Sequence, residues 1–242
     1  MSILVSVIQP GALCACISED VIPIAIRWAP LLGALATFLA VLVALFRESF
    51  FLTLRRPKLS VTIKAEPPDS HKTEFRFSDG TVVPSYVFRL WVVNSGKTTA
   101  ERVQVFARRL SRRHANGEFR NETRFLPMNL LWSHGVGVTL EGLARGMGHH
   151  CDLGYIFPPD SVNPNIRRPA RIPQGKRCLQ LETEVRPFTG TSHLETGIYH
   201  LELRAAGANT RPIDVVIEIS LDGGWHDEEA DMLSRGVGLR VL

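Results

Sequence analysis

Residues 86–110 read YVFRLWVVNSGKTTAERVQVFARRL, and this stretch decides the fold class of the chain. In its first half, apolar residues occupy both faces of an extended segment, in two alternating sets: Tyr86, Phe88, Leu90 and Val92, then Val87, Trp91 and Val93. Apolar residues on both faces are typical of a strand that is covered on both sides, so we predict a central strand. A turn at Asn94-Ser95-Gly96 ends it, and the alternation resumes at Val103 and Val105.

The spacing within this stretch also resembles a known pattern. Its members are Leu90, Val92, Asn94, Gly96, Ala100, Val103 and Val105. They resemble the V-x-N-x-G-x(3)-A-x(2)-V-x-V hairpin of immunoglobulin-like adhesion modules, including the CARDB type. The resemblance implies a two-sheet β-sandwich and brings no catalytic residues with it. The apolar run WAPLLGALATFLAVLVALF at 28–46, followed by such a domain, is also similar to uncharacterised bacterial single-pass membrane proteins.

Alternating apolar residues predict further strands on both sides of this stretch, at 59–63, 74–77, 126–132, 179–185, 199–203 and 213–221. Asp79-Gly80 is a strong hairpin turn, and the glycine-rich segment 135–148 is predicted to be a loop. Residues 227–235 have acidic side chains first and Arg235 last, which indicates a short helix. The predicted fold is mainly β: an N-terminal transmembrane helix, then a two-sheet antiparallel immunoglobulin-like sandwich with a short C-terminal helix.

Residues 28–46 read WAPLLGALATFLAVLVALF and contain no ionisable side chain. As a helix they extend roughly 28 Å, close to the hydrocarbon thickness of a bilayer. We predict one transmembrane helix here, beginning near Pro30. The predicted organisation is a tail at 1–27, the helix at 28–46, a juxtamembrane linker at 47–57 and a soluble domain at 58–242.

Charge beside the span predicts its orientation. The exit side carries Arg47, Arg55, Arg56 and Lys58, whereas Arg27 is the nearest basic residue on the other side. By the positive-inside rule the domain is cytoplasmic, at the inner face of a cell inner membrane. A periplasmic domain remains the alternative.

The chain has a formal charge of +4 and a pI near 9.1. This charge fits arginine enrichment beside a membrane or contact with anionic lipid, while the scarcity of aromatics among the arginines argues against nucleic acid. The sequence has four cysteines: Cys14 and Cys16 in the tail, and Cys151 and Cys178 in the domain. The two in the domain have neither the spacing of zinc ligands nor that of a CxxC motif, and the four do not form a disulfide framework.

Two basic segments are candidate contact sites. Arg108, Arg109, Arg112 and Arg113 precede a turn at Asn116-Gly117, and such a hairpin is suited to contact anionic headgroups or a partner. A solvated hairpin face is the alternative. The long segment 160–177 contains Arg167, Arg168 and Arg171, and loops of this length are often partner-binding elements.

The span also has two rows of small residues four positions apart: Ala36, Ala40 and Ala44, with Gly33 and Thr37 beside them. Small-xxx-small faces allow helices to approach closely, so a homodimer is one interpretation. Alanine is equally common in spans that do not associate.

His149, His150, Cys151 and Asp152 have metal-ligand chemistry, but neighbours in a strand point to opposite faces, so the sequence predicts no metal site. A GxSxG elbow, a phosphate-binding loop and a cofactor motif are all absent from the sequence, so we predict neither a cofactor nor an enzyme. The predicted function is a non-enzymatic, membrane-anchored module that binds a protein or a small ligand. The alternative is a membrane-perturbing effector that acts through oligomers of its helix.

Overall fold

The structure, a computed structural model, describes residues 21–54, 56–159, 176–185, 187 and 189–242. The chain forms two units: a helical unit that ends at Leu54 and a β-rich unit that begins at Arg55. Side chains of the helix are described from Trp28 to Leu45.

The helical unit contains α1 (Val21–Leu54), which is long and apolar enough to span a membrane near the N-terminus. Its segment from Trp28 to Leu45 has a mean hydropathy of 2.2, and none of that segment is buried within the structure. The prediction that the helix begins near Pro30 is wrong. Pro23 takes the first-turn position, where a missing N–H leaves no bond unmade, and Pro30 lies inside the helix. Most of the predicted linker at 47–57 is also helical, because α1 continues to Leu54.

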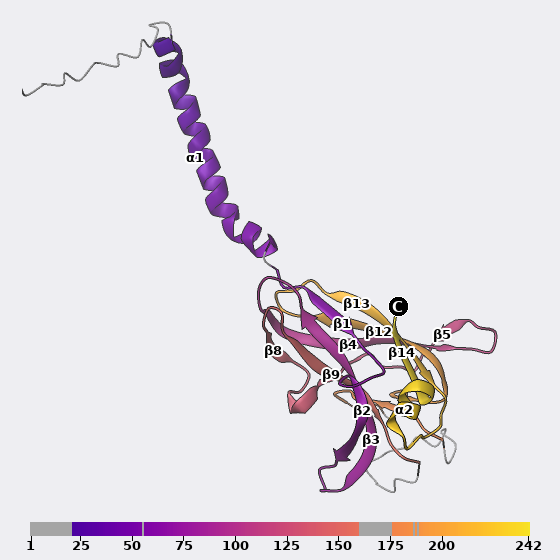
Figure 1. Cartoon of the computed structure of the whole chain (residues 1–242). Coiled ribbons are helices and arrows are strands. Elements are labelled where there is room, and N and C mark those ends of the chain that lie inside the picture. The colour runs from indigo at the N-terminus through magenta and orange to yellow at the C-terminus, as the bar shows by residue number, and fades with distance from the viewer. Residues whose placement is uncertain (1–20, 55, 160–175, 186, 188) are drawn as a thin grey trace, which may run out of the picture. The chain divides into compact units, whose positions relative to one another are not determined.

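The β-rich unit consists of two antiparallel seven-stranded sheets, so the predicted two-sheet, mainly β architecture is confirmed (Figure 1). The first sheet contains β1 (Leu59–Thr62), β2 (Ser70–Arg76), β3 (Val82–Asn94), β7 (Leu131–Trp132), β9 (Gly148–Ile156), β10 (Leu179–Leu181) and β11 (His193–Leu194). The second sheet contains β4 (Ala100–Arg113), β5 (Phe119–Asn121), β6 (Met128–Asn129), β8 (Leu140–Leu143), β12 (Gly197–Ala206), β13 (Ile213–Leu221) and β14 (Val237–Val241).

Strand β3 is central, as predicted, with β1 and β2 paired along one side and β9 along the other. The expected hairpin between β3 and β4 is wrong, however, because the two strands belong to different sheets. Both sides of β3 already have partners, so the turn after Asn94 carries the chain to the second sheet. There β4 pairs with β12 from Tyr199 opposite Arg112 to Ala206 opposite Gln104.

One contiguous apolar core lies between the sheets, as alternating burial along the strands predicts. Alternating positions of four long strands, β3, β4, β12 and β13, are almost fully buried: Phe88, Leu90 and Val92; Val103 and Val105; Leu201 and Leu203; Ile217 and Ile219. Trp132 is also buried, and its indole Nε1 donates to the carbonyl of Val103 at 3.2 Å, which joins the two sheets.

The side chain of Asn94 fixes the end of the domain at which β1 begins. Its Oδ1 accepts from the backbone N–H groups of Lys58, at 3.2 Å, and Gly96, at 3.0 Å. Its Nδ2 donates to the carbonyls of Thr98, at 2.7 Å, and Leu143, at 2.9 Å. Asn94 is fully buried, so all of its side-chain hydrogen-bonding capacity is used within the protein. Gly96 is required beside it, because a Cβ there would lie 2.3 Å from the backbone nitrogen of Lys58.

Three elements differ from the sequence predictions. The predicted strand at 126–132 is two short strands, because β6 pairs with β4 whereas β7 pairs with β9 in the other sheet. The predicted loop at 135–148 contains β8, which pairs with β4.

At the C-terminus, the predicted helix is short: α2 (Glu229–Asp231) continues into a π-helical turn, η2 (Met232–Gly236). The chain also forms one more strand here than predicted, because β14 follows this turn and pairs with β13. A five-residue strand that follows Gly236 and contains Gly238 has too little alternation to be found by pattern.

Candidate functional site

The hairpin arginines lie at the end of β4 that is far from Asn94. Three of them face acidic side chains of neighbouring segments: Arg108 Nη1 is 3.3 Å from Asp214, Arg109 Nη1 3.4 Å from Glu202 and Arg112 Nη1 3.7 Å from Glu195. Arg113 is exposed and makes no ion pair with any residue of the described ranges. Most of the positive charge of this hairpin is therefore balanced within the domain.

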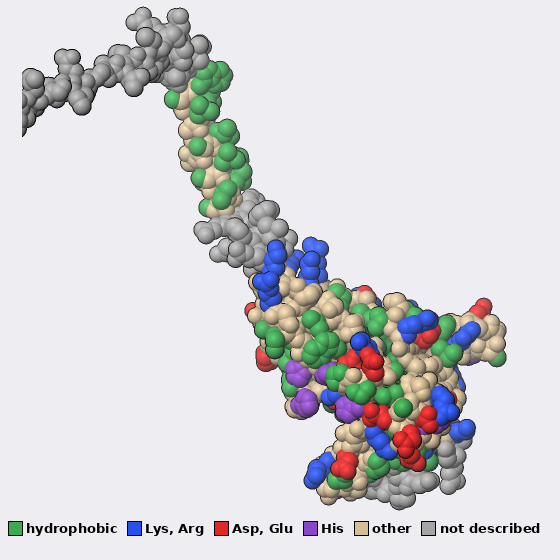
Figure 2. All heavy atoms as spheres, in the orientation of Figure 1, with side chains coloured by type: hydrophobic (Ala, Val, Ile, Leu, Met, Phe, Trp, Pro, Cys, Tyr) green, Lys and Arg blue, Asp and Glu red, His purple; other side chains and the backbone are tan. Residues whose placement is uncertain are grey.

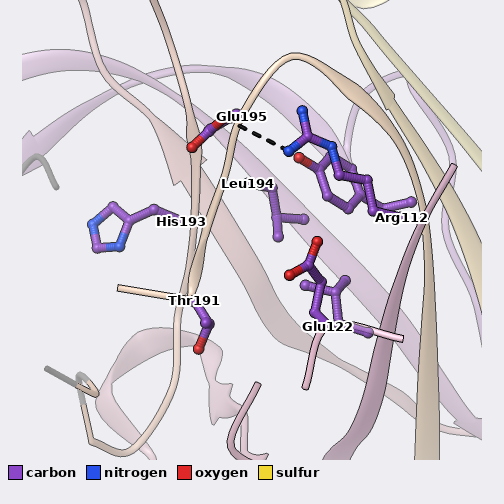
Figure 3. Close-up of a pocket in the computed structure, with 8 residues that line it drawn as sticks. Arg112, Glu122, Thr191, His193, Leu194 and Glu195 are labelled. Atoms are coloured by element: carbon purple, nitrogen blue, oxygen red, sulfur yellow. Dashed lines mark ion pairs between the residues drawn. The ribbon is translucent and has the colours of Figure 1, made fainter. Parts of the chain in front are cut away.

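Arg112 also lines a cavity of about 140 Å³ (Figure 3). Four segments supply its walls: β4, the chain after β5, the chain around β11 and the start of β12. The lining residues are Leu110, Arg112, Glu122, Thr191, His193, Leu194, Glu195 and Tyr199. In Figure 3 the ion pair of Arg112 with Glu195 forms one side, while the His193 ring points away from Arg112.

Acidic side chains outnumber guanidinium groups in this cavity. Arg112 contacts Glu195, donates to the carbonyl of Thr196 at 3.1 Å and lies 5.6 Å from the ring centroid of Tyr199. Glu122 is half-buried, and its carboxylate makes no hydrogen bond or ion pair with any side chain in the described part of the chain. Burial raises the pKa of the Tyr199 hydroxyl, with Arg112 opposing and Glu195 and Glu122 adding to the rise. The cavity therefore offers a carboxylate and a neutral phenol to a small molecule.

The other predicted contact residues are not brought into this cavity. Arg167, Arg168 and Arg171, with most of segment 160–177, lie outside the described residues. The last residue of that segment, Arg177, is buried, donates to the Phe157 carbonyl at 2.6 Å and lies 4.6 Å from the Trp225 ring centroid. Arg177 therefore has a packing role.

The small residues of α1 are exposed along the helix: Gly33, Ala36, Thr37, Ala40 and Ala44. Thr37 Oγ1 donates to the Gly33 carbonyl at 2.9 Å, so this hydroxyl is satisfied within its own helix. Self-association through this face remains a prediction.

Histidines gather on one region of the domain, visible as purple side chains in Figure 2. His150 Nε2 is 3.1 Å from Asp69 Oδ1, and its ring lies 4.5 Å from that of Trp91. His149 lies on the other face of β9, between the rings of Trp132, at 5.8 Å, and His134, at 6.5 Å. Within the described ranges, no group of three His, Cys, Asp or Glu side chains is placed to hold a metal ion.

Asp152 is a buried carboxylate with both oxygens occupied. Ser133 Oγ donates to its Oδ1 at 2.5 Å and the Tyr155 hydroxyl donates to its Oδ2 at 3.0 Å. Ser133 is only 2% exposed, so its hydroxyl cannot meet a substrate. Burial raises the pKa of Tyr155, and Asp152 raises it further. These contacts join the turn after β7 to β9 and form no nucleophile.

We expect acid to destabilise the domain through its half-buried histidines. Burial lowers the pKa of His149, with His134 and His150 adding to the effect and Asp152 opposing it; burial and then Arg89 lower that of His71. The unfolded chain therefore binds more protons, so stability is complete above the unfolded pKa of about 6.5 and falls as the pH drops below it. Urea midpoints of the full chain in detergent should be lower at about pH 5 than at about pH 7.5.

The variant His149→Gln should show a smaller difference between the two midpoints. His114→Gln, at an exposed turn, is the matched control and should keep the wild-type difference. A His149→Gln variant with the full wild-type difference would contradict this assignment.

Sequence reasoning found only Arg112 among the cavity residues. The others come from segments up to 89 positions apart, from Leu110 to Tyr199, and no local motif connects them. One feature of the sequence could have indicated the cavity: the acidic residue Glu122 lies on the second arm of the hairpin that carries the four arginines.

No protein-family model and no curated protein matches the sequence. The class of the protein therefore follows from its own features: an apolar N-terminal helix of spanning length, joined to a domain of two antiparallel β-sheets.

Proposed function

We propose that this protein is a non-enzymatic, membrane-anchored ligand-sensing module. In this proposal α1 spans a bacterial inner membrane, and the domain is an immunoglobulin-like sandwich in the cytoplasm. The particular function is capture of a small ligand in the cavity beside Arg112.

One observation carries the proposal: the half-buried Glu122 carboxylate lacks a partner among the described side chains yet lines a cavity. A carboxylate withdrawn from water gains from a cationic partner, and none is supplied by the cavity walls beyond the already paired Arg112. The volume suits a molecule of a few heavy atoms, since a cavity of similar size accommodates benzene. We therefore assign the ligand to small primary amines, with the ammonium group at Glu122 and the Tyr199 hydroxyl as a second contact.

The ligand can be tested with methylamine, ethylamine and ethanolamine as probes on the full chain in nanodiscs. A bound probe should raise the melting temperature with concentration, and a hundredfold excess over Kd corresponds to about 2.7 kcal/mol of stabilisation. Glu122→Gln should abolish the shift, because a neutral amide does not pair with ammonium.

Glu118→Gln, which removes an exposed carboxylate from the nearby turn, is the charge-matched control and should keep the shift. If none of the three amines shifts wild-type melting, or if Glu122→Gln responds equally, the cavity assignment fails.

The proposed topology rests on the basic residues that follow the span. Reporters active on only one side of the membrane, fused after Leu242, test it. Activity of a cytoplasmic reporter alone supports the proposal, whereas activity of a periplasmic reporter alone places the domain in the envelope.

A second candidate function is favoured by the exposed small residues of α1. In this alternative, ligand-driven assembly packs the helices through Ala36, Ala40 and Ala44 and perturbs the bilayer. Crosslinking in membranes should then give oligomers that Ala40→Leu weakens. Monomer under all conditions would eliminate this candidate.

A further inference from the structure

Exposed cations gather at the end of the domain where β1 begins, and we call this surface the basic end. It is formed by the residues beside Pro57, by three turns, after β3, β8 and β12, and by the start of β4. Its members are Arg56, Lys58, Lys97, Arg102, Arg145 and Arg211. Figure 2 shows blue side chains at this end of the domain.

Hydrogen bonds hold these segments together. Asn94 connects Lys58 to the turn after β3, and its backbone carbonyl accepts from the Gly146 N–H at 2.8 Å in the turn after β8. Asn209, in the turn after β12, accepts from the Glu101 N–H at 3.0 Å and donates to the Thr99 carbonyl at 3.0 Å. The cations therefore belong to one connected surface.

These cations are free to bind an external anion. All six are exposed, and none makes an ion pair with a residue in the part of the chain that the structure describes. The exposed carboxylates in these segments are Glu101 and Glu141, so positive charge prevails. Met147, 58% exposed, adds an apolar side chain beside Arg145. The hairpin arginines differ, because three of the four already have acidic partners.

Chain connectivity indicates which anion lies within reach. Helix α1 ends at Leu54, and Pro57 is already buried in the domain. The apolar segment ends at Leu45, so the chain from there to Pro57 consists of about 14 Å of helix to Leu54 and at most about 10 Å beyond it, which keeps this end of the domain near the headgroups. Arg113, at the other end of the 14-residue strand β4, lies roughly 40 Å along the strand from Ala100.

We propose that the basic end docks on the anionic lipid headgroups of the membrane that holds α1. This inference rests on the membrane anchoring in the proposed function and assigns the lipid contact to these residues and not to the Arg108 to Arg113 hairpin. Docking leaves the cavity at the opposite end of β4 open to the solvent.

Acetylation by a water-soluble reagent, read by mass spectrometry on the full chain in nanodiscs, tests the proposal. Lys58 and Lys97 report on the basic end, and exposed Lys64 is the internal reference. Adding phosphatidylglycerol to phosphatidylcholine discs should slow acetylation of Lys58 and Lys97 about fivefold relative to Lys64. Salt at about 1 M should remove the difference, because the Debye length falls to about 3 Å.

A triple variant changes Arg56, Arg145 and Arg211 to Gln and leaves the reporter lysines in place. Anionic lipid should protect Lys58 and Lys97 from acetylation much less in this variant than in the wild type. The matched control removes three exposed arginines elsewhere, Arg76, Arg120 and Arg124→Gln, and should keep it. Equal acetylation in neutral and anionic discs, or equal protection in both variants, overturns the proposal. Protection by added DNA but not by anionic lipid also overturns it and assigns the surface to nucleic acid.

Different results would refute the membrane anchoring by α1 and the docking of the basic end. A chain that does not remain with the discs on size-exclusion chromatography refutes the membrane anchoring itself. A chain that remains but shows no lipid-dependent protection refutes only the basic-end docking.

Discussion

Replacing Asn94 with alanine is expected to lower the free energy of unfolding of the domain by about 3–5 kcal/mol. The substitution leaves the N–H groups of Lys58 and Gly96 and the carbonyls of Thr98 and Leu143 without their buried partner. Each unsatisfied buried group costs about 1–3 kcal/mol, and partial access of water accounts for the lower total. Urea unfolding of the full chain in detergent, followed by near-UV circular dichroism, measures the loss.

Two variants sharpen this experiment. Asn94→Asp keeps the shape but places a carboxylate oxygen against the carbonyls of Thr98 and Leu143, so it should destabilise at least as much as alanine. Asn121→Ala, which removes an exposed amide that bonds to Ser111, should cost below about 0.5 kcal/mol. A loss below about 1 kcal/mol for Asn94→Ala would contradict the role given to its hydrogen bonds.

The second large effect is expected at Trp132. Alanine there should cost about 3–5 kcal/mol, because the indole is 1% exposed and its removal leaves a cavity between the sheets. Trp132→Phe keeps much of the apolar volume but loses the donor to the Val103 carbonyl, so it should cost about 1–3 kcal/mol. The same urea experiment distinguishes the two variants.

Trp91→Phe is a suitable comparison, because Trp91 is only half-buried and packs against His150. It should destabilise less than either substitution at Trp132. Equal effects of phenylalanine and alanine at Trp132 would show that the hydrogen bond, and not the packing, provides its contribution.

The fold class was predictable because burial on strands follows a period of two. Segments such as 86–94 and 213–221 carry that alternation over many residues, and β3 and β13 match them closely. Strand pairing was not predictable. The turn after Asn94 has the residue types of a hairpin turn. Strand β4 nevertheless joins the other sheet, because β1 and β9 already pair with the two sides of β3.

Short strands and the cavity were beyond the reach of the sequence for related reasons. Strands β6, β7 and β14 contain two to five residues, so pairing with longer neighbours, and not their own pattern, makes them strands. The cavity is lined by residues of the paired strands β4 and β12, and by Glu122 from the chain after β5, so it depends on strand pairing. Ion pairs were not predictable from the sequence either, because their members can be far apart in the chain. Arg108 and Asp214 are 106 positions apart but form an ion pair.

The register between β4 and β12 has a consequence for biosynthesis. Arg112 cannot pair with Tyr199 until the chain has been synthesised at least to β12. The second sheet is complete only after β13 and β14 have also been synthesised. At typical ribosomal speeds of 5–20 residues per second, the 188 residues after α1 take roughly 10–40 s to emerge. If α1 enters the bilayer as soon as it leaves the ribosome, the nascent domain remains beside the lipid with unpaired strand edges for this whole interval. If the proposed anchoring and orientation hold, chaperones at the membrane surface would therefore meet this domain before it is folded.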